Sequence, residues 1–245
     1  MVEQKTAIVT GASRGIGHAV AQRFCSLGWR VITVSRHALP QACPWNAQPN
    51  THVQLDLSNL DEITNTVATL RPLLGGFKLH ALVNNAGVSP KGSQGERVNS
   101  LTTDLGVWQE MYNTNFYAPL ILTRGFAQEL SLARGSVVNL CSIAANRVHP
   151  FAGAAYATSK AALLALTREM AADMAPMGVR VNAIAPGEIN TSILSPGTGH
   201  IVENNIPMRR LGEVGEIADL IEFLCSGKSS YITGAEIAID GGQRV

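Results

Sequence analysis

Short apolar runs alternate with longer stretches of helical periodicity along the whole chain. Runs such as Ala7-Ile8-Val9 are apolar at successive positions, as strands buried on both faces of a parallel sheet are. Such runs predict seven strands at residues 6–10, 30–35, 52–56, 81–84, 136–141, 180–185 and 236–240. Helical periodicity predicts helices over residues 15–27, 61–73, 105–130, 154–175 and 217–224.

This alternation of strands and helices defines the expected fold class. Strand–helix–strand units need right-handed crossovers and lead to an open sheet with helices on both faces. We expect one α/β domain over residues 1–245, a doubly wound Rossmann-type fold with a mainly parallel, seven-stranded sheet. One segment breaks the pattern, because three prolines oppose a helix in residues 36–51. We expect a loop there, with at most a helical turn.

Composition and charge narrow the classes of function. The 19 Lys and Arg residues nearly balance 18 Asp and Glu, so the net charge of +1 gives no reason to expect nucleic acid or an anionic membrane as partner. Four cysteines without a C-x-x-C pair and six histidines without H-x-x-x-H spacing disfavour a disulfide scaffold or a metal site. No apolar run reaches about 18 residues and no signal core begins the chain, which predicts a soluble, cytoplasmic protein.

A glycine-rich turn between the first strand and the first helix predicts a dinucleotide site. Gly11 permits a sharp turn, and Gly15 and Gly17 let the backbone and the helix approach a pyrophosphate. The helix N-terminus supplies unpaired N–H groups to that anion. Glycines also serve ordinary loops, but the strand-to-helix context favours the nucleotide interpretation. The expected cofactor contacts in this turn are Gly11, Ser13, Arg14, Gly15, Ile16 and Gly17.

Residues after the second strand bear on the choice of cofactor. An acidic residue there would bind the adenosine ribose and repel a 2′-phosphate, but Ser35 and Arg36 occupy these positions. Arg36 and Arg14 together can bind a phosphate through charge-assisted hydrogen bonds. We therefore expect NADP(H) as the preferred cofactor, with NAD(H) possible. The alternative is that both arginines are solvated surface residues.

Two further strand ends supply expected cofactor contacts. Asp56 could accept a hydrogen bond from the adenine amino group or cap the next helix, a role that suits Ser58 better. After the fourth strand, small residues permit close approach of the cofactor, and amide side chains can tie neighbouring strands together. The residues expected at these ends are Asp56, Leu57, Asn84, Ala86 and Gly87.

Four polar residues predict the chemistry. Tyr156 and Lys160, four residues apart, share a helix face, so the ammonium can favour the phenolate if the tyrosine pKa falls from about 10. Tyr156 would then protonate a carbonyl oxygen during hydride transfer, with Ser142 bonding the same oxygen. Asn115 lies inside a predicted helix, where it suggests a hydrogen bond to water leading a proton to Lys160. Taken alone, each feature has a simpler explanation: chance spacing for Tyr156 and Lys160, a helix cap for Ser142 and a core amide for Asn115.

These motifs resemble the classical short-chain dehydrogenases/reductases across essentially the whole chain. The matching pieces are residues 10–17 and 84–87, Asn115, Ser142, Tyr156, Lys160, Pro186-Gly187 and Asp240-Gly241-Gly242. The segments Ile206-Pro207, Arg210-Leu211-Gly212 and Ser230-Tyr231-Ile232-Thr233-Gly234 further resemble the bacterial branch that contains the 3-oxoacyl-[acyl-carrier-protein] reductases.

The resemblance implies roles for residues at matching positions. Asn115, Ser142, Tyr156 and Lys160 correspond to the catalytic tetrad, of which Tyr156 and Lys160 also meet the cofactor. It also implies a homotetramer, or a homodimer, with one interface formed by the helices around Asn115 and Tyr156. The segment after the sixth strand is expected to contact the nicotinamide through Pro186, Gly187, Ile189 and Thr191.

Three segments depart from the family pattern. Ser142 and Tyr156 are one residue further apart than usual, which alters the loop around His149. Residues 91–103 look like an insertion, and residues 36–51 replace the usual second helix. The first two departures flank the expected substrate mouth, where His149 either lines the mouth or lies exposed on the loop. The mouth shows few aromatic or charged residues, which favours a moderately apolar substrate.

We therefore expect an NADP(H)-dependent oxidoreductase that interconverts a small carbonyl compound and a secondary alcohol. The alternatives are a non-catalytic dinucleotide-binding regulator, an NAD(H)-preferring alcohol dehydrogenase, and an isomerase or dehydratase that oxidises its substrate transiently. The intact tetrad disfavours the regulator, and the short region after Pro186 disfavours large nucleotide-sugar substrates. Residues 190–208 suit either a lid over the substrate or an ordinary mobile loop.

Overall fold

A seven-stranded, entirely parallel sheet forms the centre of the molecule, in the order β3-β2-β1-β4-β5-β6-β7. The computed structural model describes residues 4–38, 52–92, 95–191 and 198–245. The strands are β1 (Thr6–Thr10), β2 (Arg30–Ser35), β3 (His52–Gln54), β4 (Ala81–Asn84), β5 (Ser136–Leu140), β6 (Arg180–Pro186) and β7 (Glu236–Ile239). The predicted doubly wound fold is confirmed, and the strand order reverses between β1 and β4.

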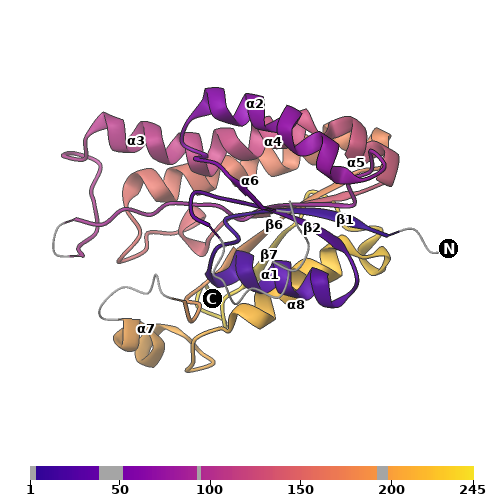
Figure 1. Cartoon of the computed structure of the whole chain (residues 1–245). Coiled ribbons are helices and arrows are strands. Elements are labelled where there is room, and N and C mark those ends of the chain that lie inside the picture. The colour runs from indigo at the N-terminus through magenta and orange to yellow at the C-terminus, as the bar shows by residue number, and fades with distance from the viewer. Residues whose placement is uncertain (1–3, 39–51, 93–94, 192–197) are drawn as a thin grey trace.

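Helices cover both faces of this sheet (Figure 1). Helices α2, α4, α5 and α6 lie on one face, and α1 and α8 lie on the other. Their bounds are α1 Gly15–Ser26, α2 Leu60–Leu70, α3 Leu105–Tyr112, α4 Ala118–Gly125, α5 Ala127–Ala133, α6 Ala154–Met174, α7 Thr198–Asn205 and α8 Val214–Cys225. Among the ranges described above, no helix has the length and apolar character needed to cross a membrane.

Each face of the sheet has its own hydrophobic core. Successive strand residues point to opposite faces, so Ile8 and Leu82 pack beneath α2 and α4 while Val9 and Val83 pack against α1 and α8. All four side chains are fully buried. The two buried faces explain why the strands are apolar at successive positions rather than at alternate ones.

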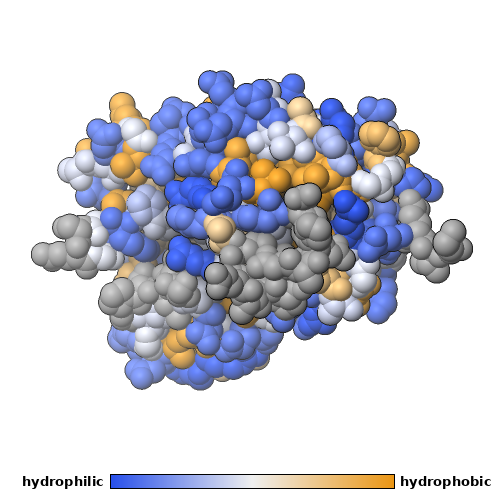
Figure 2. Space-filling view, viewed as in Figure 1, coloured by the Kyte–Doolittle hydropathy of each residue, from blue (hydrophilic) through white to orange (hydrophobic). Residues whose placement is uncertain are grey.

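Helix α2 shows how the sequence sets a helix start. The Asn59 side chain accepts hydrogen bonds from the backbone N–H groups of Asp61 and Glu62, so Asn59 is the cap. The prediction that Ser58 or Asp56 caps this helix is wrong, because Ser58 donates to Asp56 through both N–H and hydroxyl at 2.9 Å. Beyond the cap, the outward residues of α2 are mostly polar, and Figure 2 shows the corresponding hydrophilic surface.

The helix predicted over residues 105–130 is interrupted twice. A π-helical turn, Asn113–Tyr117, joins α3 to α4, and the backbone leaves helical geometry at Phe126 before α5 begins. A π turn inserts one extra residue into the helix and is common at functional sites. Apolar periodicity carries no signal for that single-residue insertion, so the sequence predicted one continuous helix.

Two other predictions fall partly outside the described residues. The loop expected over residues 36–51 is described only through residue 38. Of the lid expected over residues 190–208, residues 192–197 lie outside the described part of the chain. The remainder contains α7, a helix that the sequence did not predict.

Candidate functional site

A cavity of about 360 Å³ opens at the carboxyl ends of the strands, along the position where the strand order reverses. Among the residues that line it are most of those predicted to bind the cofactor: Gly11, Ser13, Arg14, Gly15, Ile16, Ser35, Arg36, Asp56, Leu57, Ala86, Gly87, Pro186, Gly187, Ile189 and Thr191. The predicted catalytic residues Ser142, Tyr156 and Lys160 also line it. Gly17, Asn84 and Asn115 lie outside this lining, and each has a structural contact that explains its position.

The glycine-rich turn is built for close backbone packing. Gly11 has a φ of +67°, in the left-handed region that favours glycine, and a Cβ atom there would lie 2.8 Å from the Cα atom of Ala86. A Cβ atom at Gly17 would overlap the carbonyl oxygen of Gly11 and the side-chain nitrogen of Asn85. The Asn85 amide in turn donates to the carbonyl oxygens of Thr10 and Gly11, at 2.9 and 3.1 Å. Gly17 therefore shapes the turn instead of lining the cavity.

The N-terminus of α1 faces this cavity and fits an anion. Arg14 occupies the cap position without a side-chain hydrogen bond to the helix, and the first turn carries no acidic residue. The N–H groups that follow Gly15 and the positive end of the helix dipole therefore remain available to a negatively charged group. Together with the space that Gly11 and Gly17 leave, this arrangement fits a dinucleotide pyrophosphate.

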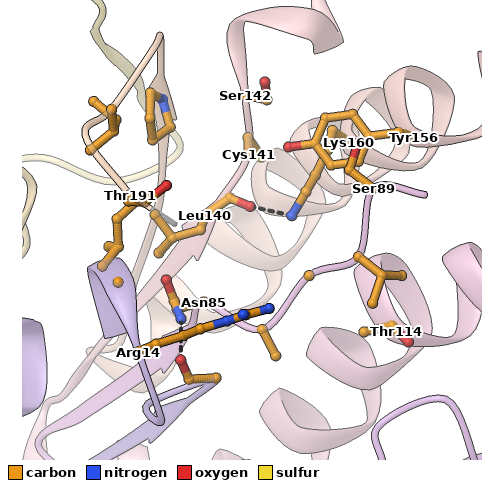
Figure 3. A pocket seen from close by; sticks show the side chains of 18 of the residues that line it. Arg14, Asn85, Ser89, Thr114, Leu140, Cys141, Ser142, Tyr156, Lys160 and Thr191 are labelled. Atoms are coloured by element: carbon orange, nitrogen blue, oxygen red, sulfur yellow. Dashed lines mark hydrogen bonds between the residues drawn. The ribbon is translucent and has the colours of Figure 1, made fainter. Parts of the chain in front are cut away.

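The end of the cavity next to β2 carries positive charge. Arg36 follows β2 and is exposed, and Arg14 lines the same cavity from the turn before α1 (Figure 3). The Ser35 hydroxyl donates to the carbonyl oxygen of His37 at 2.6 Å, which fixes the backbone around Arg36. His37, Leu55 and Asn85 also line the cavity, although they were not among the predicted cofactor contacts.

Asn84 lies behind the cavity wall rather than in it. Its side chain is 2% exposed and donates to Asn139 of β5 at 2.8 Å and to Thr123 of α4 at 3.4 Å. As the last residue of β4, it points into the layer of α4 and α6, away from the expected cofactor. Of the two roles that the sequence indicated for this segment, the structure gives Asn84 the tie between strands.

Lys160 is buried next to Tyr156. The side chain is 3% exposed, and its ammonium donates to the carbonyl oxygen of Leu140 at 2.6 Å, as Figure 3 shows. The Nζ atom lies 5.9 Å from the centre of the Tyr156 ring. Because burial disfavours the charged form, the pKa of Lys160 falls from 10.5 to about 8.

Tyr156 directs its hydroxyl toward the Ser142 end of the cavity (Figure 3). Burial raises the pKa of Tyr156 to about 12, the hydrogen bond with Ser142 lowers it, and Cys141 and Glu188 raise it further. The fall in pKa that the sequence indicated is not what this structure shows, because burial outweighs the stabilisation of the phenolate. The phenol is protonated at neutral pH, which is the state that a proton donor requires.

Asn115 sits in the π-helical turn and is fully buried. Its amide nitrogen donates to the Val88 carbonyl at 3.1 Å and to the Ser159 hydroxyl at 3.0 Å, and its oxygen accepts from the Val88 N–H at 2.9 Å. A Cβ atom at Gly87 would lie 3.3 Å from Lys160 Nζ and 3.4 Å from the Asn115 oxygen. Asn115 therefore fixes the wall segment that separates it from Lys160.

Replacing Lys160 with methionine is expected to stabilise the protein at pH 7. With a folded-state pKa of about 8 against 10.5, the unfolded chain binds more protons between these values, so the parent gains stability as the pH rises through that window. Below pH 8 the parent carries the full cost of the buried charge, roughly 3 kcal/mol at 1.36 kcal/mol per pKa unit. After the bond to Leu140 is lost, we expect a net gain of about 1–3 kcal/mol for Lys160→Met.

Urea unfolding at pH 7 and pH 10 measures this difference. The gain from Lys160→Met should be smaller at pH 10 than at pH 7. Lys228→Met, at an exposed position, should leave the free energy of unfolding unchanged at both pH values. A variant less stable than the parent at pH 7, or a difference that does not vary with pH, would contradict the burial argument.

The two segments that depart from the family pattern near the substrate mouth pack against each other. The Lys91 ammonium donates to the carbonyl oxygen of Phe151, and Arg97 donates to that of Ala152 at 2.8 Å. The Ala154 N–H donates to the carbonyl oxygen of Val98 at 3.2 Å. The insertion at residues 91–103 thus holds the altered loop that precedes α6.

The mouth carries more charge than the sequence indicated. Lys91, His149 and Glu188 all line the cavity, and the His149 Nε2 atom lies 2.8 Å from the Glu188 carboxylate. Both side chains of this pair are largely buried. His149 therefore lines the mouth, the first of its two predicted positions. One available signal for Glu188 was its place directly after Pro186-Gly187, inside the expected nicotinamide segment.

The reversal of strand order, the glycine-rich turn and the pairing of Tyr156 with the buried Lys160 define a class of protein, the oxidoreductases that use a nicotinamide dinucleotide. A family model described as "Enoyl-(Acyl carrier protein) reductase" matches residues 11–244. The chain belongs to the short-chain dehydrogenase/reductase family.

Relatives and solved structures agree with this assignment over nearly the whole chain. Protein FixR of Bradyrhizobium diazoefficiens is 52% identical, over 99% of this chain and 88% of that protein. The 3-oxoacyl-[acyl-carrier-protein] reductase FabG of Aquifex aeolicus is 31% identical, over 98% of each. A crystal structure of a short-chain dehydrogenase/reductase from Brucella ovis, in complex with a partially ordered NAD, is 53% identical. It has a TM-score of 0.83 and covers 97% of this chain and 100% of that one.

Proposed function

We propose that this protein is an NADP(H)-dependent oxidoreductase that interconverts a small carbonyl compound and a secondary alcohol, with Tyr156 as the acid and base. The observation that carries the proposal is the position of Tyr156, which lines one cavity together with Ser142, Lys160 and the glycine-rich turn. Membership of the family supports the reaction class, and the NAD in the Brucella ovis structure supports a nicotinamide dinucleotide.

The residues that would hold the cofactor follow from the cavity lining. The turn from Gly11 to Ile16 would bind the pyrophosphate at the N-terminus of α1, and the segment from Pro186 to Thr191 would bind the nicotinamide end. When bound, the nicotinamide supplies a hydride to the carbonyl carbon or accepts one from the alcohol.

The chain's own side chains orient the substrate oxygen and transfer the proton. Ser142 hydrogen-bonds the substrate oxygen and orients it, and Tyr156 gives its proton to that oxygen as negative charge develops. Lys160, with a pKa of about 8, stands between its charged and neutral forms near physiological pH and so can return a proton to the phenolate. Asn115 holds the Val88 wall in place beside Lys160 and is proposed to order a water on the proton path.

The test is carbonyl-dependent oxidation of NADPH by the purified protein, measured with a panel of small ketones and aldehydes. We expect turnover with at least one member of the panel, and slower turnover when NADH replaces NADPH. Tight binding of either dinucleotide without turnover of any compound would favour the non-catalytic regulator instead.

Arg36 is proposed to select NADP(H) by binding the 2′-phosphate together with Arg14. Hydrogen bonds to a charged group contribute about 1.5–3 kcal/mol, so Arg36→Ser should weaken NADP⁺ binding by about 10- to 100-fold. NAD⁺ lacks the phosphate, and its dissociation constant should change little. Calorimetric titration with both cofactors measures this, with Arg168→Ser, at an exposed position on α6, as the control. An equal loss for NAD⁺ and NADP⁺ would argue against phosphate selection.

Three further proposals concern the assembly, a lid and the location of the protein. A homotetramer or homodimer is supported by two exposed apolar side chains, Leu105 at the start of α3 and Tyr117 at the end of the turn that holds Asn115. A lid over residues 190–208 is supported by Ile189 and Thr191, which line the cavity where that segment begins. A cytoplasmic location is supported by the cysteines, since the three that the structure describes are all free.

A further inference from the structure

Three ionisable side chains outside the proposed tetrad meet at the substrate mouth. Lys91 comes from the insertion, His149 from the altered loop after β5, and Glu188 from the turn after β6. We call these three residues the mouth cluster. They line the same cavity as Tyr156, and the negative charge of Glu188 raises the Tyr156 pKa, so the cluster lies within electrostatic range of the proposed reaction.

The hydrogen bonds of His149 define its protonation state. Its Nδ1 atom accepts from the Phe151 N–H at 3.2 Å, so that nitrogen carries no proton. The ring proton then lies on Nε2, which donates to Glu188 at 2.8 Å. His149 is neutral in this arrangement, and it orients the Glu188 carboxylate without cancelling its charge. A carboxylate offers about four acceptor positions, so Glu188 retains acceptor capacity for a ligand.

Lys91 supplies the compensating charge. Its half-buried ammonium donates to the carbonyl oxygen of Phe151, and that nitrogen has further N–H groups to donate. Burial lowers the pKa of Lys91, whereas the negative charge of Glu188 raises it. The two charged groups are therefore close enough to interact, and both can act on a ligand in the cavity. With His149 neutral, the mouth cluster has no net charge.

Val88, Ile143, Phe151 and Ala152 add apolar side chains to the lining of the same cavity, next to the hydroxyl groups of Ser89 and Ser142. A substrate carboxylate would meet the negative charge of Glu188, and a substrate ammonium would meet that of Lys91. A hydroxyl group avoids both repulsions, because it can donate to the carboxylate and accept from the ammonium at once.

We propose that the mouth cluster is a polar subsite for a substrate hydroxyl group, and that the protein interconverts hydroxy ketones and the corresponding diols. This inference rests on the proposed function and specifies its substrate class. The reduction of the ketone balances as two electrons and one proton from NADPH, delivered to the carbonyl carbon, and a second proton from Tyr156, delivered to the oxygen. The hydroxyl held by the mouth cluster is unchanged in the reaction.

The proposal is tested with pairs of ketones in which a methyl group replaces the hydroxyl group. Hydroxyacetone is compared with butanone, and 4-hydroxybutan-2-one with pentan-2-one, by kcat/KM with NADPH. We expect a preference of about 10- to 100-fold for the hydroxy ketone in at least one pair, as a charge-assisted hydrogen bond provides. Glu188→Gln and Lys91→Met should abolish this preference, so that the two kcat/KM values of a pair become similar. Glu169→Gln, at an exposed position on α6, should preserve the preference.

A ligand-observed NMR measurement of hydroxyacetone binding to the NADP⁺-loaded protein separates failure of the subsite from failure of the proposed function. Binding that depends on Glu188, without turnover, would support the subsite and overturn the proposed reaction. Equal turnover within both ketone pairs would support the reaction and overturn the subsite. A preference for acetoacetate or aminoacetone over the hydroxy ketones would also overturn the subsite, because a charged ligand would then be favoured.

Discussion

Tyr156→Phe is expected to reduce carbonyl-dependent oxidation of NADPH by about 10²- to 10⁴-fold, the usual contribution of a positioned general acid. The substitution removes only the hydroxyl, which faces Ser142 across the cavity and holds its proton at neutral pH. The ring remains, so the packing of α6 around Lys160 should be retained. Dinucleotide affinity, measured by calorimetry, should change by much less than the turnover number.

The matched control for this variant is Tyr231→Phe, which removes the same hydroxyl from a fully exposed ring outside the cavity lining. It should leave both turnover and affinity as they are. If Tyr156→Phe retained most of the activity with every accepted carbonyl compound, another group would have to donate the proton. If both variants lost dinucleotide affinity equally, the effect would not be specific to Tyr156.

Gly17→Ala is expected to weaken dinucleotide binding by about 5- to 150-fold, from an overpacking cost of about 1–3 kcal/mol. The added methyl group has no space, because its position overlaps the Gly11 carbonyl and the Asn85 amide. Asn85 would have to give up its bonds to Thr10 and Gly11, which hold the turn that faces the pyrophosphate. The thermal midpoint of the apoprotein should fall as well.

Gly215→Ala is the control, since a Cβ atom added at Gly215 in α8 meets no other atom within 4 Å. That substitution should be neutral or stabilise the protein by about 0.5–1 kcal/mol, because alanine is the better helix former. Thermal unfolding and dinucleotide titration of both variants measure the comparison. Unchanged affinity in Gly17→Ala would show that the turn tolerates a shift and does not set the pyrophosphate site.

Much of the fold was predictable because the sheet is entirely parallel. Strands buried on both faces stand out as apolar runs, and the alternation with helices leaves few topologies open. The predictions were wrong where one residue changes the geometry. The π-helical turn at Asn113–Tyr117 interrupts a continuous apolar pattern, and Asn59 caps α2 although two nearby residues, Asp56 and the more suitable Ser58, are also of types that cap helices.

The candidate site was predictable where function and backbone geometry coincide. Gly11 and the Tyr156–Lys160 pair carry their meaning in local spacing, and the structure brings them to one cavity. The grouping of the mouth cluster has no such signal, because Lys91, His149 and Glu188 are far apart in the sequence and come together only through tertiary packing. Asn84 shows the opposite case, since its place at the end of a strand suggested a ligand contact while its side chain faces the interior.

The contacts between residues 91–103 and the loop before α6 make the substrate mouth a transferable unit. Its hydrogen bonds end on the main-chain oxygens of Val98, Phe151 and Ala152, so they do not depend on which side chains stand at those positions. Phe151 can therefore be exchanged to reshape the mouth while the frame stays in place. Grafting the unit onto a relative would require both segments, because either one alone would leave its donors or its carbonyl oxygens without their partners.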